Sequence, residues 1–257
     1  MNVTDRSRGA DPRWVLERHW YTGGPGTTHT GTHHARPLPR LWALPDGTAA
    51  RSIVRPRPTP DDTVAPLDFT GRIRRLCADV AARCPDLAHI DPPAVLFTFT
   101  TSRTRRSAGL LARVTPMRFR EGAQTRRTRG VVYRAQQYYV DGREMLYLVT
   151  FCLPRFLDLS FEEKFITVFH ELYHISPQFD GDLRRHGGRY EVHSKSKKDY
   201  DAHMAVLVER YLADHPNPGA FDYLRLGASD LWRLHGGITG VTVPRPKMIP
   251  LGTCVGV

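Results

Sequence analysis

The sequence predicts an α+β fold in which a small antiparallel sheet packs against one helix, preceded by a disordered N-terminal region. Three observations support this prediction. Apolar residues recur at helix or strand spacing only beyond residue 67. Several strand-like runs come before a helix that has clear capping signals. Residues 1–66 are rich in Pro, Gly, His and Arg and have no sustained periodicity.

The chain divides into three parts. Its 257 residues, 40% of them hydrophobic, suit one domain of ordinary size with a buried core. We predict a disordered or loosely attached region over 1–66, a folded domain over 67–226 and a C-terminal tail over 227–257. Prolines between residues 244 and 250 exclude the tail from the interior of a sheet, because proline cannot donate a ladder hydrogen bond.

The first elements of the folded part follow from the apolar spacing. A helix is expected over 70–86, where apolar residues lie at helical spacing and Pro85 ends the pattern. Strands are expected over 94–101, 109–119, 131–140 and 144–153. The Asp141-Gly142 pair is typical of a tight turn, so the last two strands are expected to form a hairpin.

A second helix is predicted to begin after Ser160. Ser160 is a favourable N-cap and Glu163 stands three residues later, which together make a capping box. Apolar residues at helical spacing give this helix one face that can pack on the sheet, and Pro177 ends it. A further helix is predicted over 199–214.

Positive charge is concentrated in one stretch of the chain. The formal net charge is +11, and residues 101–130 hold nine arginines against one acidic residue, Glu121. This cluster, Arg103 to Arg129, suits a nucleic-acid partner contacted through its phosphates. A solvated loop that binds no polyanion is the alternative that the sequence leaves open.

The remaining composition excludes several classes of protein. The sequence has no apolar run of about eighteen residues, the length of a membrane-spanning helix, so no membrane partner is expected. The first residues lack the apolar core of a signal peptide, which favours a cytoplasmic location. The cysteines show no paired spacing, so buried free thiols are expected at Cys77, Cys84, Cys152 and Cys254.

The second helix carries the most informative motif, His170-Glu171-Leu172-Tyr173-His174. Residues four apart lie about 40° apart around a helix and one turn apart along it, so both imidazoles can reach one ion. Zinc binds histidine nitrogens at ~2.0–2.1 Å. Glu171 is rotated about 100° from His170, which places it beside the metal to take a proton from metal-bound water. We therefore predict a zinc site with Glu171 as the general base.

A third protein ligand is expected, because a catalytic zinc usually has three protein ligands and a water. The candidates after the helix are Asp180, Asp182, His186, His193, Asp201, His203 and Glu209. His193 leaves enough chain after His174 for a return across the helix. His186 is a rival that stands beside two glycines, and Glu209 would give a site of two histidines and one glutamate.

The polar run that starts at Asp180 has two interpretations. Asp180 or Asp182 could accept the second N–H of a ligand histidine and so fix its tautomer. The run could equally form an Asx-type loop that an Arg–Asp ion pair holds together. Tyr190 or Tyr200 could stabilise an oxyanion, with ordinary core packing as the alternative for both.

The run HELYHISPQFDGDLRRHGGRYEVHSKSKKDYDAHM at 170–204, preceded by LPRFLDLSFEEKF, resembles the phage-type zinc metallopeptidases, distant relatives of the SprT-like zinc proteases. The resemblance extends from about residue 68 to about residue 214. It implies a zincin-like fold, with the HExxH helix on a small antiparallel sheet. It also implies His170, His174 and His193 as metal ligands and Glu171 as the base. The His-Gly step usual around the third ligand of SprT-like proteins is missing, although His186-Gly187 is similar to it.

Motif and resemblance together predict a zinc-dependent peptidase that acts on a protein or peptide in the cytoplasm of a bacterial or phage-infected cell. One alternative is a nucleic-acid-binding module with a structural zinc site. Another is a phage-derived hydrolase with a different class of substrate. A structural zinc site has no use for Glu171 and usually prefers cysteines, which favours the enzyme.

Overall fold

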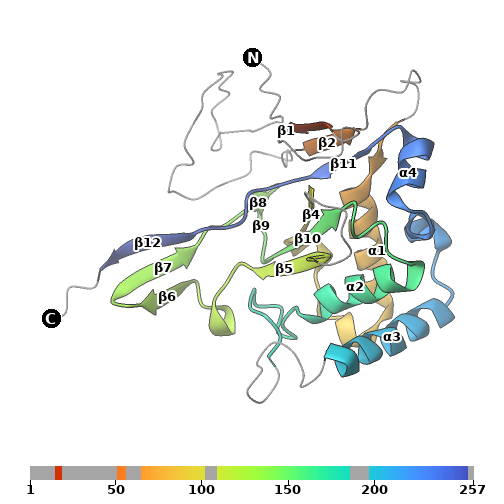
Figure 1. Cartoon of the computed structure of the whole chain (residues 1–257). Coiled ribbons are helices and arrows are strands. Elements are labelled where there is room, and N and C mark those ends of the chain that lie inside the picture. Colours follow the sequence, from red (N-terminus) through yellow and green to blue (C-terminus); the bar gives the residue numbers. More distant parts are fainter. Residues whose placement is uncertain (1–14, 19–50, 56–64, 102–108, 186–196, 254–257) are drawn as a thin grey trace.

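The computed structural model describes residues 15–18, 51–55, 65–101, 109–185 and 197–253. It confirms a mixed α+β structure built from small sheets and several helices. Figure 1 shows the longer helices gathered on one side, while a narrow sheet extends away from them on the other. Most of the predicted disordered region, residues 1–66, lies outside the described residues.

A three-stranded sheet forms the support for the helices. Its strands, in spatial order, are β4 (Val95–Thr101), β10 (Tyr147–Leu153) and β5 (Ala112–Pro116). The central strand β10 runs parallel to β4 and antiparallel to β5. The sheet is therefore mixed, which corrects the antiparallel sheet that we expected. The parallel pair arises because the chain between β4 and β10 forms a long crossover that includes β5.

The two faces of this sheet bury different apolar clusters, because successive side chains of a strand point to opposite faces. On one face Phe97, Val149 and Val114 belong to the main cluster, which also includes residues from the helices. On the other face Leu96 and Leu148 belong to a smaller cluster. The helices thus cover a single face of the sheet.

The first long helix confirms the prediction made for residues 70–86. Helix α1 (Phe69–Arg83) begins at Asp68, whose carboxylate accepts a hydrogen bond from the Gly71 N–H at 3.0 Å. It ends before Pro85. Two short 3-10 helices, η1 (Pro85–Leu87) and η2 (Pro92–Ala94), then lead into β4.

The next two helices also lie where they were expected. Helix α2 (Phe161–Tyr173) begins after Ser160, and both hydrogen bonds of the predicted capping box with Glu163 are present. Helix α3 (Lys197–Ala213) packs along α2. The buried Lys164 side chain of α2 donates to the carbonyl oxygens of Leu224 and Leu226, each at 2.8 Å. Burial lowers the pKa of this lysine to about 8.

The chain after α3 returns to the main core. It forms η4 (Pro218–Ala220), η5 (Asp222–Arg225), α4 (Ala228–His235) and β11 (Ile238–Val241). Leu231 and Trp232 of α4 are part of the main apolar cluster. Strand β11 is an inner strand of a sheet that also contains β1 (Val15–Arg18), β2 (Arg51–Arg55) and β3 (Leu67–Asp68). Part of the predicted tail, 227–257, is thus packed on the core, while the division into three parts stays a prediction. The expectation that the tail forms no inner strand is wrong for β11, because this strand precedes the prolines.

The third sheet has the order β12 (Met248–Thr253), β7 (Val131–Ala135) and β6 (Thr125–Thr128). The hairpin predicted between 131–140 and 144–153 forms only next to its turn, and the prediction that the two long runs pair is wrong. Only β8 (Tyr139–Val140) and β9 (Arg143–Glu144) pair across the Asp141-Gly142 turn. The turn sequence determines the pairing of the two residues on each side. Beyond them, β10 pairs with β4 and β5, and β7 pairs with β6 and β12.

The described cysteines and helices test two expectations from composition. Cys77, Cys84 and Cys152 are buried free thiols, as predicted, and burial raises the pKa of each. Cys254 lies outside the described residues. Within the described ranges, no helix combines the length and the apolar character that crossing a bilayer requires.

Candidate metal centre

The last turns of α2 carry the histidine motif. Val168, Phe169 and Leu172 of this helix are buried in the main cluster, which fixes how the helix is turned about its axis. His170 and His174 lie one turn apart at its C-terminal end. His174 is buried and His170 is partly exposed, so the pair lies at the border between core and solvent.

The two imidazoles converge on one point. The Nε2 atom of His170 lies 3.0 Å from the Nε2 atom of His174. The rings are almost perpendicular, with an interplanar angle of 83° and centroids 4.6 Å apart. A separation of this size lets both nitrogens bond one ion at the ~2.0–2.1 Å typical of zinc.

Helix α3 supplies an oxygen for the other nitrogen of each ring. Asp201 Oδ1 lies 3.6 Å from His170 Nδ1, and the Tyr200 hydroxyl lies 3.5 Å from His174 Nδ1. The Tyr200 ring also stacks on the His174 ring, with centroids 5.5 Å apart and an angle of 20°. Histidines that bind metals commonly donate their second N–H to such an acceptor, which fixes tautomer and orientation.

This donor set fits a divalent cation. With the proton of each ring on Nδ1, facing Asp201 or Tyr200, both Nε2 lone pairs are directed at the same small space. Two lone pairs that face each other repel, and a cation between them removes the repulsion. Neutral imidazole nitrogens are ligands that zinc prefers.

Glu171 lies on the sheet side of the histidines. Its carboxylate is buried, and Oε2 accepts a hydrogen bond from the Val114 N–H of β5 at 2.6 Å. Burial raises the pKa of Glu171 to about 7, although the Val114 N–H and the positive charge of Arg113 act in the opposite direction. Such a carboxyl group can exchange a proton near neutral pH, which a general base requires.

Comparison with known proteins identifies the segment that carries this geometry. The sequence model of one family, described as putative phage metallopeptidase, matches residues 70–211, more than half of the chain. The chain belongs to this family. The match runs from α1 through most of α3, so it includes β5, α2 and the two histidines. No curated protein and no solved structure matches the chain, and the kinship with SprT-like proteases stays a prediction.

The described residues bring together two of the three predicted ligands, His170 and His174. No group of three or more His, Cys, Asp or Glu side chains suited to a metal occurs among the residues that the structure describes. His193 and its rival His186 both lie outside those residues. Their roles stay predictions.

Glu209, another candidate for the third metal ligand, does not lie beside the two histidines. Glu209 is exposed, and it lines a small cavity of about 310 Å³ together with Phe161, Glu162 and Phe165. These residues lie in the first turns of α2, whereas His174 follows its last turn. Helix α3 runs antiparallel to α2, so Tyr200 near its start reaches the histidines and Glu209 does not.

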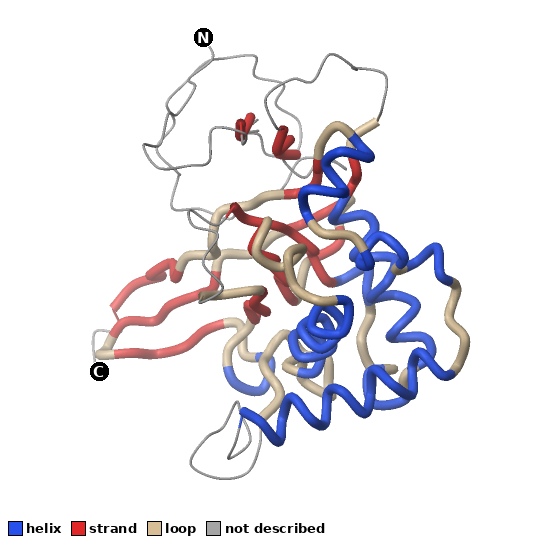
Figure 2. Tube along the Cα trace, turned by 45° about the vertical axis from the view of Figure 1, so that its right-hand side comes forward, coloured by secondary structure: helices blue, strands red, loops and turns tan. Residues whose placement is uncertain are grey.

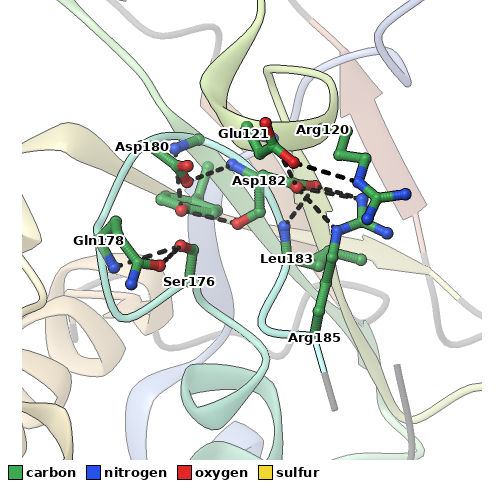
Figure 3. Close-up of polar contacts among 10 residues, drawn as sticks. Arg120, Glu121, Ser176, Gln178, Asp180, Asp182, Leu183 and Arg185 are labelled. Atoms are coloured by element: carbon green, nitrogen blue, oxygen red, sulfur yellow. Dashed lines mark hydrogen bonds and ion pairs between the residues drawn. The ribbon is translucent and has the colours of Figure 1, made fainter. Parts of the chain in front are cut away.

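The loop after α2 confirms one of the two interpretations of the run at Asp180. The Asp182 carboxylate accepts from the Glu121 N–H at 3.1 Å and the Leu183 N–H at 2.8 Å, and pairs with Arg185 (Figure 3). A contact with His186 or His193 stays a prediction, because both lie outside the described residues. Asp180 accepts from the Asp182 N–H at 3.1 Å, as in an Asx turn. The run is therefore a loop held by an Arg–Asp ion pair. It is tied to η3 (Arg120–Gly122) through Glu121.

Arg184 donates hydrogen bonds to the C-terminal end of α2. Its backbone N–H donates to the His174 carbonyl oxygen and its Nε–H to the Tyr173 carbonyl oxygen, both at 2.7 Å. The guanidinium also lies 3.9 Å from the centroid of the Tyr173 ring. A cation at the negative end of a helix stabilises that end, and here it holds the last turn that carries His174.

Sequence reasoning missed two contacts of this site. Asp201 was considered only as a metal ligand, yet it faces the Nδ1 atom of His170. The signal for this role was an acidic residue beside Tyr200 at the start of a helix expected to follow α2. The Val114 N–H had no signal, because a backbone donor on a strand 57 positions away cannot be recognised from residue types.

Proposed function

We propose that this protein is a zinc-dependent metallopeptidase with a zincin-like active site. The observation that carries the proposal is the convergence of two histidine Nε2 atoms to 3.0 Å beside the buried carboxylate of Glu171. The family to which the chain belongs supports peptide hydrolysis as the reaction. A structural zinc site would give no role to the buried Glu171 carboxylate that Val114 holds beside the two histidines.

His170 and His174 would hold the zinc, and we propose His193 as the third ligand, as the family resemblance implied. Bound zinc would supply Lewis acidity, which polarises a carbonyl group and makes water easier to deprotonate. The Tyr200 hydroxyl and the Asp201 carboxylate would keep both rings turned with Nε2 toward the ion.

Glu171 would carry the proton during hydrolysis. Its carboxylate takes a proton from the attacking water, whose oxygen bonds to the peptide carbonyl carbon. The proton then passes to the amide nitrogen as the C–N bond breaks, so the products are a carboxylic acid and an amine. The hydrogen bond from Val114 holds the carboxylate in place for both transfers.

Strand β5 would hold the substrate next to the Glu171 carboxylate. It lies at the edge of the β4-β10-β5 sheet, and its Val114 N–H is the contact to Glu171. An extended peptide that pairs with an exposed sheet edge is held by backbone hydrogen bonds and tolerates many side chains. We therefore propose that the scissile bond lies along β5.

The test is proteolysis of fluorescently labelled casein by the zinc-loaded chain and by its Glu171→Gln variant. Glutamine keeps the shape of the side chain but cannot accept the proton, so the rate should fall by ~10²–10⁴-fold while the zinc content stays the same. His203→Ala is a matched control, because His203 is an exposed histidine of α3 in the same region.

Wild-type turnover by Glu171→Gln would show that another group accepts the proton. Equal losses in Glu171→Gln and His203→Ala would show that the assay reports general damage rather than chemistry. A zinc-loaded wild-type chain that cleaves neither casein nor shorter peptides would leave the site without the proposed activity.

A further inference from the structure

The β12-β7-β6 sheet extends away from the body of the protein. In Figures 1 and 2 it lies on the side opposite the helices. All its described side chains are exposed or only partly buried, and none belongs to either of the buried apolar clusters. We call these strands, with the turn at 129–130, the projecting sheet.

Part of the arginine cluster, Arg103 to Arg129, lies on the projecting sheet. Arg126 and Arg127 lie on β6 and Arg129 in the turn that follows, while Arg134, which is not part of the cluster, lies on β7. The sequence of the projecting sheet contains no Asp or Glu. Arg118, by contrast, is largely buried and pairs with Glu144. Arg103, Arg105 and Arg106 lie outside the described residues.

One face of the projecting sheet combines arginine with aromatic rings. Arg126 stands directly opposite Tyr133 in the pairing of β6 with β7, so both side chains lie on the same face. The Arg126 guanidinium lies 5.3 Å from the centroid of the Phe119 ring. Arg127 and Arg134 occupy the other face, because side chains alternate along a strand.

An arginine also occupies the tip. The turn between β6 and β7 has φ 51° at Arg129 and 79° at Gly130. A two-residue turn with both φ angles positive favours Asn, Asp or Gly at its first position. Arginine there costs conformational energy and places a cation at the outermost point of the hairpin.

We infer that the projecting sheet binds single-stranded nucleic acid. The arginines would neutralise phosphates, and Tyr133 with Phe119 would offer rings on which bases stack. A duplex fits less well: the major groove, about 12 Å wide, admits a two-stranded ribbon. Here β12 pairs along the whole length of β7 and adds a third strand, which separates the outer strands by ~10 Å before side chains are counted. This inference does not depend on the metal centre.

The test measures fluorescence anisotropy of a labelled twenty-nucleotide oligo-dT with the full chain at several salt concentrations. Arg126→Glu/Arg127→Glu should weaken binding at least tenfold. Arg74→Glu/Arg75→Glu is the matched control, since it reverses two adjacent exposed arginines on α1, and it should weaken binding less than twofold. Tyr133→Ala should weaken binding of oligo-dT but not of heparin, which offers charge without bases.

Arg129→Asn tests the tip without endangering the fold, because asparagine suits the turn better than arginine. It should lower the slope of log affinity against log salt by about 0.7, the value for one phosphate contact on a single strand. Equal weakening by the two double variants would overturn the inference. So would tighter binding to a duplex, to heparin or to phosphatidylserine vesicles than to oligo-dT.

Discussion

At the scale of single residues, the site depends on how two imidazole rings are turned. The spacing in the sequence places His170 and His174 on one side of a helix, but it does not select which nitrogen faces the metal. Asp201 and Tyr200 make that selection by lying against the Nδ1 atoms, 3.6 and 3.5 Å away. The Nε2 atoms are thereby left to face each other.

This arrangement predicts that Asp201→Asn weakens zinc binding while the fold persists. Loss of an acceptor that orients a ligand histidine typically costs 10–100-fold in metal affinity, because the ring is no longer held in the ligating orientation. Competition with a chelator measures the zinc affinity, and circular dichroism measures the fold. Asp201→Glu keeps an acceptor and should recover part of the affinity. An Asp201→Asn protein that binds zinc like the wild type would show that Asp201 does not orient His170.

At the scale of elements, the loop from Ile175 to Arg185 connects α2 to the rest of the protein. The Tyr147 hydroxyl donates to the Asp182 carbonyl oxygen at 2.8 Å and accepts from the Gly181 N–H at 2.9 Å. The Arg118 N–H donates to the Gly181 carbonyl oxygen at 3.0 Å. Gly181 has φ 88°, and a Cβ atom there would collide with the Arg118 side chain. The loop therefore has one tightly specified path.

We predict that Asp182→Ala destabilises the protein by about 2–4 kcal/mol, because it removes a buried carboxylate that pairs with Arg185 and accepts from two partly buried N–H groups. The matched control is Asp222→Ala. Asp222 also pairs with an arginine three residues later, Arg225, but its side chain is 56% exposed, against 9% for Asp182. The control should lose less than about 0.5 kcal/mol. Urea denaturation of both variants gives the comparison, and equal losses would contradict the structural role assigned to Asp182.

The elements differ in how far the sequence could predict them. Helix α2 was predicted to begin after Ser160 because a capping box is a local signal, and it begins there. The partner of β10 could not be predicted, since Val149 pairs with Phe97 on one side and Val114 on the other, both distant in the chain. The Asp141-Gly142 turn was recognised correctly, but a turn does not determine pairing beyond its nearest neighbours.

At the scale of the whole molecule, one buried core supports the site while the projecting sheet stands apart from it. The main cluster joins α1, α2, α3 and α4 to one face of the central sheet. The candidate metal centre lies at its border, where α2 meets α3 and β5. The closeness of His170, His174 and Glu171 could be predicted because they lie within about one helical turn. The contributions of α3 and β5 could not, because they depend on packing between distant segments.

Zinc titration of the metal-free chain by calorimetry tests the central claim most directly. We predict about one zinc per chain for the wild type, for Glu171→Gln and for His203→Ala. Binding should be at least ~100-fold weaker for His170→Ala and for His174→Ala, because each removes a proposed ligand. A wild-type chain that takes up no zinc, or single histidine variants that bind it as tightly as the wild type, would contradict the proposed metal centre.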